Sequence, residues 1–220
     1  MSISIFNVTG PVTIGPSSSH TAGAVRIGRV ARRIAGGEIK HAHITFYGSF
    51  AETYKGHGTD LAIIGGLLGM RMNDPNIKHS LSIAKERGLK YEIETASDPR
   101  YHPNTVRIQA DGEQRSINIR ASSVGGGSIS LDCMNAYEME IPCTLPTIIV
   151  AHKDMPGIIA ASSDILADSG TNIAFMKLSR SRRGGDAVVV FEVDTEVSSH
   201  TLNLLKELPQ VSEIIYVPKI

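Results

Sequence analysis

Hydroxyl side chains and one imidazole are crowded into a short segment near the start of the sequence, over residues 15–23. The side chains that could contact a ligand there are Ser17, Ser19, His20 and Thr21. The apolar and basic run over residues 24–35 follows directly and predicts a helix. Hydroxyls and unpaired backbone N–H groups at the positive end of a helix dipole form a receptor for a small carboxylate or phosphate. The alternative is an ordinary helix cap beside a solvated histidine.

A second histidine has a comparable setting. His57 stands between two glycines, so the backbone can bend sharply beside it and no adjacent side chain shields it. Thr59 follows just before the apolar run 61–70, which predicts another helix, so we expect His57 to stand at a helix N-terminus. An imidazole can take or give a proton near neutral pH. The pattern predicts a shared pocket for His20 and His57; the alternative for His57 is a loop histidine that fixes a turn.

The glycine-rich segment 123–128 is predicted first as a mobile or packing loop and second as a ligand loop. It lacks the strand–loop–helix setting of a nucleotide site, so it does not predict one.

The charge balance bears on the classes of partner that this chain could bind. Lys plus Arg and Asp plus Glu are equal at 22 each, which argues against nucleic acid or an anionic membrane as the partner. The sequence has no stretch that predicts a transmembrane span and no signal-peptide pattern at its start. We therefore expect a cytoplasmic protein with no nucleic-acid or membrane partner.

The cysteines are too few for a cluster. The two of them, Cys133 and Cys143, are expected to be thiols in a cytosolic chain. An iron–sulfur cluster takes more thiolates than these two can supply. His41 and His43 form an HxH pair, but it heads a predicted strand and is expected to be solvated. The sequence therefore predicts no metal site in this chain.

Pro142 and Pro146 interrupt the pattern and divide the chain into predicted domains at 1–143 and 147–220. The first is a mixed helix and sheet domain, and Asp111-Gly112 predicts a hairpin within it. Its predicted strands are 3–8, 42–47, 105–110, 115–121, 129–133 and 137–141, and its predicted helices are 24–35, 61–70 and 80–87. The second has the predicted order strand 147–151, helix 156–168, strand 172–178, strand 187–193, helix 198–208 and strand 211–217. This α/β chain therefore ends in a ferredoxin-like βαββαβ unit.

The second domain resembles ACT domains, which are small amino-acid-sensing modules. The resemblance rests on the sequence HKDMPG over 152–157 and GTNI over 170–173, together with the order of elements. It implies self-association, with a ligand held between two copies by His152, Asp154 and Asn172. The alternatives are that Asp154 caps a helix, that Asn172 ends a turn, and that the domain only assembles chains.

The first domain resembles the beta chain of iron–sulfur-dependent L-serine dehydratases. The resemblance rests on two contiguous blocks, 15–28 and 48–69, and extends over nearly the whole chain. It implies conversion of L-serine to pyruvate and ammonia, in which a base removes the Cα proton and an iron Lewis acid helps the hydroxyl leave. It also implies that a partner alpha subunit holds the iron in a [4Fe–4S] cluster, so this chain should be inactive alone. The site residues it implies are His57 and His20 for proton transfer and Ser17, Ser19, Thr21, Thr59 and Asn104 for substrate binding.

Two other classes of function stay open at this point. One is an amino-acid sensor without catalysis, although such a sensor has no need for two histidines next to glycine-rich turns. The other is a mononuclear metal hydrolase built on His20 and His57. No HExxH or carboxylate-rich pattern accompanies these histidines, so the hydrolase is the weaker hypothesis.

Overall fold

The computed structural model describes residues 19–220, and the chain forms two compact units that divide after Asn135. The predicted strand 3–8 and the candidate Ser17 lie outside the described residues. Within residues 19–220 no helix is both long and apolar enough to cross a membrane.

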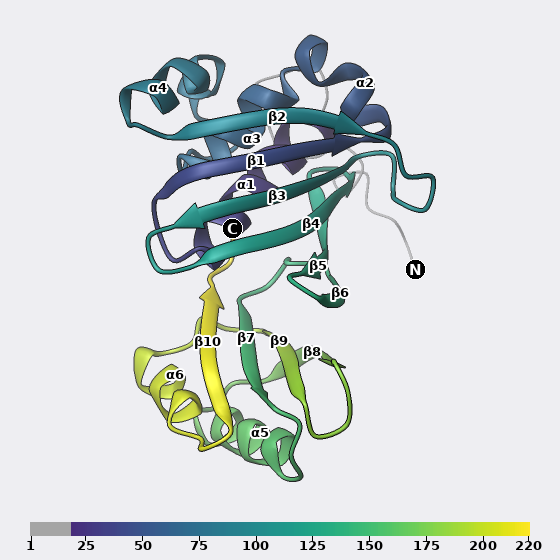
Figure 1. Ribbon diagram of the computed structural model, residues 1–220. Coiled ribbons are helices and arrows are strands. Elements are labelled where there is room, and N and C mark those ends of the chain that lie inside the picture. The colour runs from purple at the N-terminus through teal and green to yellow at the C-terminus, as the bar shows by residue number, and fades with distance from the viewer. Residues whose placement is uncertain (1–18) are drawn as a thin grey trace, which may run out of the picture. The chain divides into compact units, whose positions relative to one another are not determined.

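The first unit contributes five strands to the first sheet and has helices packed against them (Figure 1). Its strands lie in the order β2-β1-β3-β4-β5, with β1 and β2 parallel and the other neighbours antiparallel. The helices α1 and α3 lie behind the sheet in the view of Figure 1. The elements are η2 (Ser19–Gly23), α1 (Ala24–Ile34), β1 (Ile39–Tyr47), α2 (Gly48–His57), α3 (Thr59–Leu67), η3 (Pro75–His79), α4 (Ser80–Glu86), β2 (Lys90–Ala96), β3 (Thr105–Gly112), β4 (Ser116–Gly125) and β5 (Ser128–Met134).

Most predicted elements of this unit are confirmed within a few residues, including the β3–β4 hairpin. Apart from the short turns η2 and η3, two elements were not predicted. The first is α2, whose sequence is rich in glycine and polar residues and lacks an apolar stripe. The second is β2, an edge strand whose side chains are mostly exposed, so no buried apolar run marks it.

A glycine contact brings α1 and α3 together. A Cβ atom on Gly28 would lie 2.5 Å from the Ile63 carbonyl oxygen, and one on Gly66 would lie 2.3 Å from the Val25 carbonyl oxygen. Only glycine allows two backbones to approach this closely. The close crossing fixes the start of α1 relative to the start of α3, where the candidate side chains lie.

The second unit confirms the predicted βαββαβ order. After β6 (Tyr137–Ile141) come β7 (Thr147–Lys153), α5 (Ile158–Asp168), β8 (Ile173–Arg180), β9 (Asp186–Val193), α6 (Ser199–Lys206) and β10 (Val211–Val217). The antiparallel sheet has the order β10-β7-β9-β8, so the strongly apolar β9 is internal and β8 is an edge.

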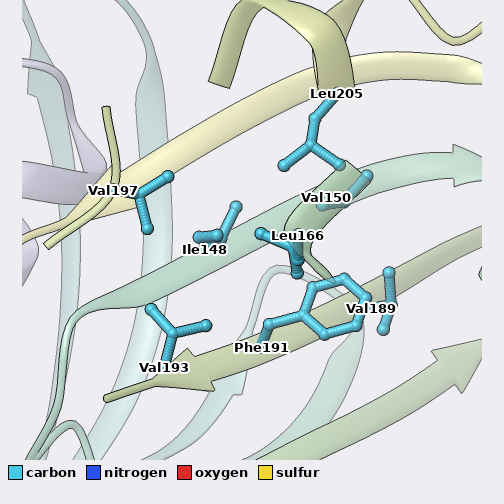
Figure 2. Close-up of a cluster of buried hydrophobic side chains, with 8 residues drawn as sticks. All are labelled: Ile148, Val150, Leu166, Val189, Phe191, Val193, Val197 and Leu205. Atoms are coloured by element: carbon cyan, nitrogen blue, oxygen red, sulfur yellow. The ribbon is translucent and has the colours of Figure 1, made fainter. Parts of the chain in front are cut away.

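Side chains from the strands and both helices of the second unit form its core (Figure 2). Phe191 and Val189 of β9 belong to the same cluster as Leu166 of α5 and Leu205 of α6. All four side chains are fully buried. The continuous apolar run of β9 and the apolar stripes of the two helices account for this packing.

Candidate functional site

The hydroxyl-rich segment forms the helical turn η2, which continues directly into α1. His20 and Thr21 in this turn are buried, with 8% and 2% of their surface exposed. Thr21 Oγ1 has no hydrogen-bond partner among residues 19–220, and no side chain caps α1. Thr21 therefore does not act as an ordinary cap.

The structure corrects the expected position of His57. It is the last residue of α2 and not the start of a helix, because residues 48–57 are helical. Gly58 follows with φ +67°, a left-handed conformation that ends α2 and lets α3 begin at once with Thr59. The break leaves His57 at the junction of the two helices, where its ring lies 4.7 Å from the ring of His20 at 85°. The two histidines of separate motifs are thus in contact.

Burial and the neighbouring imidazole set the charge state of His20. Its Nε2 lies 3.3 Å from the Ser49 hydroxyl oxygen, and its ring packs edge-on against Phe50 at 5.2 Å. Burial lowers the pKa of His20, and the proximity of His57 lowers this pKa further. A neutral imidazole accepts a proton, so the geometry is suited to a base near neutral pH.

The far side of η2 is closed by the end of β4. The sequence predicted a loop from residue 123, but β4 continues to Gly125 and Ser123 is fully buried in it. A Cβ atom on Gly23 would lie only 2.0 Å from Ser123 Oγ, so the serine packs directly on the η2 backbone. The Ser123 N–H donates to the carbonyl oxygen of Asn104 at 3.0 Å. Both Ser123 and the Asn104 backbone therefore lie beside the segment that carries His20.

Four buried polar atoms around η2 lack a hydrogen-bond partner within residues 19–220. They are Thr21 Oγ1, His57 Nδ1, Thr59 Oγ1 and Ser123 Oγ. Their elements, α2, α3 and β4, each contact η2. A buried polar atom without a partner costs about 1–3 kcal/mol, and folded proteins rarely leave several together. Such a group of donors and acceptors is typical of a site that a small polar ligand completes.

Ser49 and Ser123 are the residues that sequence reasoning missed here. Ser49 lay in an expected loop, and its contact with His20 depends on the unpredicted helix α2. Ser123 was assigned to a flexible segment because three glycines follow it. Its place at the end of an apolar strand was the available signal. Ser19 begins η2, while Ser17 lies outside the described residues.

In the second unit the candidate ligand residues have other partners. His152 is buried and its Nδ1 lies 2.8 Å from the Lys153 carbonyl oxygen. Asp154 accepts hydrogen bonds from Arg180 Nη1 at 2.9 Å and from the Gly184 N–H at 3.0 Å. The Gly184 hydrogen bond first, and Arg180 second, lower the pKa of Asp154.

Asn172 lies apart from these two residues within one copy of the chain. It precedes β8 and donates to Asp194 beyond the end of β9, whereas Asp154 contacts the turn at the opposite end of the same two strands. Eight strand residues span about 26 Å. A single copy therefore does not bring Asn172 to Asp154.

A hollow of about 570 Å³ lies on the first sheet and includes His41 and His43. His41 pairs with Asp111 at 3.6 Å and His43 with Glu94 at 3.4 Å. Within residues 19–220 no group of three or more His, Cys, Asp or Glu side chains could hold a metal ion. The described residues include two cysteines, Cys133 and Cys143, which are fewer than an iron–sulfur cluster takes, so they do not fit such a cluster.

The matching family models and the two relatives that align over almost the whole chain agree on one family. Residues 4–133 match the family described as serine dehydratase beta chain, and residues 147–210 match the ACT domain. The chain is 43% identical to a Bacillus subtilis protein named probable L-serine dehydratase, beta chain, over 96% of each chain. It is 34% identical to the L-serine dehydratase beta chain of Peptoniphilus asaccharolyticus over 97% of each.

More distantly, the chain is 24% identical to a D-3-phosphoglycerate dehydrogenase of Methanocaldococcus jannaschii, over 88% of this chain and 37% of that protein. The similarity thus covers most of this chain within a longer enzyme of another name. The two family matches and the two relatives that align over almost their whole length establish that this chain belongs to the serine dehydratase beta chain family and carries a C-terminal ACT domain.

Proposed function

We propose that this chain is the beta subunit of an L-serine dehydratase, which converts L-serine to pyruvate and ammonia together with an alpha subunit. The observation that carries the proposal is the contact between His20 and His57, together with the four buried polar atoms of η2 and its neighbouring elements that have no partner within residues 19–220. The names of the two relatives that align over almost the whole chain support it.

In this proposal the substrate carboxylate is held at η2. The hydroxyls of Thr21, Thr59 and Ser123, with Ser17, Ser19 and backbone N–H groups near them, donate hydrogen bonds to it. Hydrogen bonds to a charged group are roughly twice as strong as those between neutral groups. Asn104 orients the amino acid from the start of β3. This arrangement fixes the Cα–H bond toward the pair of imidazoles.

In this proposal the two imidazoles then act on the Cα proton of the substrate. His57 takes the Cα proton or orients the substrate. His20, whose pKa is lowered and which lies beside Ser49, assists it as a second proton acceptor or by orienting His57. Loss of the Cα proton and the β-hydroxyl releases water and leaves aminoacrylate, which hydrolyses to pyruvate and ammonia. The [4Fe–4S] cluster of the alpha subunit would supply the Lewis acid for the leaving hydroxyl, and no residue described in this chain is assigned to it.

We further propose that the second unit self-associates through β8. This strand is an edge of its sheet, and its side chains Met176 and Leu178 are 46% and 44% exposed. Exposed apolar edge strands tend to pair with another strand. Antiparallel pairing of two β8 strands would place Asn172 of one copy near the Asp154 end of the other, which a single copy does not achieve.

The test is anaerobic co-purification of the chain with a cysteine-bearing alpha chain of the same family. We expect pyruvate formation from serine only when both chains are present, and no bound iron in this chain alone. Turnover by the iron-deficient single chain would contradict the assignment of the cluster to the partner. Serine binding without turnover in the assembled complex would favour the sensor instead.

A further inference from the structure

A cluster of like charges stands on the helix that follows the site. Four arginines occur in α1, and Arg26, Arg29 and Arg33 are spaced by three and four residues, which places them on one face. Arg71, which follows α3, belongs to the same cluster because its charge acts on Arg29. We call Arg26, Arg29, Arg33 and Arg71 the arginine face.

Three of the four members of the arginine face have no counter-charge in the described part of the chain. Within residues 19–220, Arg29, Arg33 and Arg71 make no side-chain hydrogen bond or ion pair. Burial lowers the pKa of Arg29, and the charges of Arg33, Arg71 and Arg26 lower it further, with no carboxylate opposing them. A half-buried guanidinium surrounded by like charges is unfavourable in the isolated chain.

Arg32 on the same helix shows the contrast. Its Nη1 donates to the Leu67 carbonyl oxygen at 3.1 Å, and Glu38 lies 3.9 Å from its Nη2. This arginine is satisfied within its own unit and holds α1 against the end of α3. The chain has equal numbers of basic and acidic residues, so the missing counter-charges on the arginine face are a local feature.

We propose that the arginine face docks a carboxylate-rich surface of the cluster-bearing partner subunit. Guanidinium groups bind carboxylates through two parallel hydrogen bonds and are favoured at buried interface ion pairs. From Arg26 to Arg33 the face extends about 10 Å along the helix axis. A single small anion contacts one or two guanidinium groups, whereas a row of this length matches several carboxylates fixed on a folded surface.

The location of the arginine face agrees with this partner. The helix α1 begins directly after η2, so Arg26 lies within two turns of His20 and Thr21. The inference rests on the proposed function: if the partner completes the site at η2, its surface must pass next to the first turns of α1.

The test compares the double variant Arg29→Glu/Arg33→Glu with the control Lys78→Glu/Lys85→Glu. The control makes the same charge change at exposed side chains of η3 and α4. Binding to the purified alpha chain is measured at low and at physiological salt. We expect the arginine variant to bind at least about tenfold more weakly at low salt and to lose most of its salt dependence. The control should bind like the wild type.

A second variant separates docking from folding. Arg29→Gln removes the charge and keeps much of the packing, so the isolated chain should melt at the same or a higher temperature while partner binding weakens. A fall in melting temperature with normal binding would show that Arg29 is only structural and would overturn the proposal.

Three other outcomes also decide the matter. Equal affinity of the arginine variant and the control overturns the docking surface and leaves the proposed function intact. Failure of the wild-type chain to bind the alpha chain overturns both. If pyrophosphate raises the melting temperature of the isolated wild-type chain but not of the arginine variant, the face is a small-anion site and the proposal is wrong.

Discussion

The hydroxyl of Thr59 offers a test in which stability and activity move in opposite directions. Thr59 is completely buried at the start of α3, and its Oγ1 has no partner within residues 19–220. Thr59→Val keeps the shape and β-branching but removes the hydroxyl. If the hydroxyl binds the substrate and has no partner without it, then removing the hydroxyl relieves a desolvation penalty of about 1–3 kcal/mol in the unliganded chain.

The stability assay is thermal or urea unfolding of the first unit. In a chain of this size each kcal/mol corresponds to about 2–4 °C in melting temperature, so Thr59→Val should melt several degrees higher. The matched control is Thr105→Val, because Thr105 is equally buried but bonded to the His102 carbonyl at 2.7 Å and to the Ser122 hydroxyl at 2.8 Å. Its loss should lower the stability by a similar amount.

The activity assay uses the assembled enzyme. A hydrogen bond to a charged carboxylate contributes about 1.5–3 kcal/mol, which corresponds to about a 10- to 100-fold loss of kcat/KM in Thr59→Val. The reasoning is refuted if Thr59→Val melts lower than wild type with normal kcat/KM, because the hydroxyl would then be a structural cap. Thr105→Val should affect kcat/KM much less.

The remaining predictions concern the imidazoles and the second unit. His57→Ala should lower kcat in the assembled enzyme by about 10²- to 10⁴-fold with little change in melting temperature, and near-normal turnover would remove His57 from the mechanism. Since the pKa of His20 lies below its ordinary value of 6.5, the unfolded chain binds more protons below that pH, and stability to urea should fall as the pH drops through it. This pH dependence should be smaller in His20→Gln. Removal of the residues after Pro146, or Leu178→Lys, should give a smaller assembly by light scattering, whereas an unchanged mass would place the contacts outside the second unit.

Much of the second unit could be predicted because its local and global preferences agree. The β-branched apolar run of β9 and the serine cap that precedes α6 each specify their own element. The cap is seen in the hydrogen bond from the Thr201 N–H to Ser198 Oγ. The first unit was harder, since α2 and β2 carry weak patterns and are held by tertiary contacts. The start of α2 is fixed by the Pro103 carbonyl, which accepts from the Phe50 N–H at 3.3 Å.

The sequence alone determined which residue types are available to the site: two histidines, several hydroxyls and glycines that permit sharp turns. It could not place them, because the distance between His20 and His57 depends on the unpredicted helix α2 and on its left-handed end at Gly58. It also could not separate a satisfied hydroxyl from an unsatisfied one. Thr59 and Thr105 are both threonines at the start of an element, and only the packing of distant segments decides which of them finds a partner. Burial and hydrogen bonding are properties of segments brought together by the fold, and for that reason the tertiary structure, and not the motif, identified Ser123 and the arginine face.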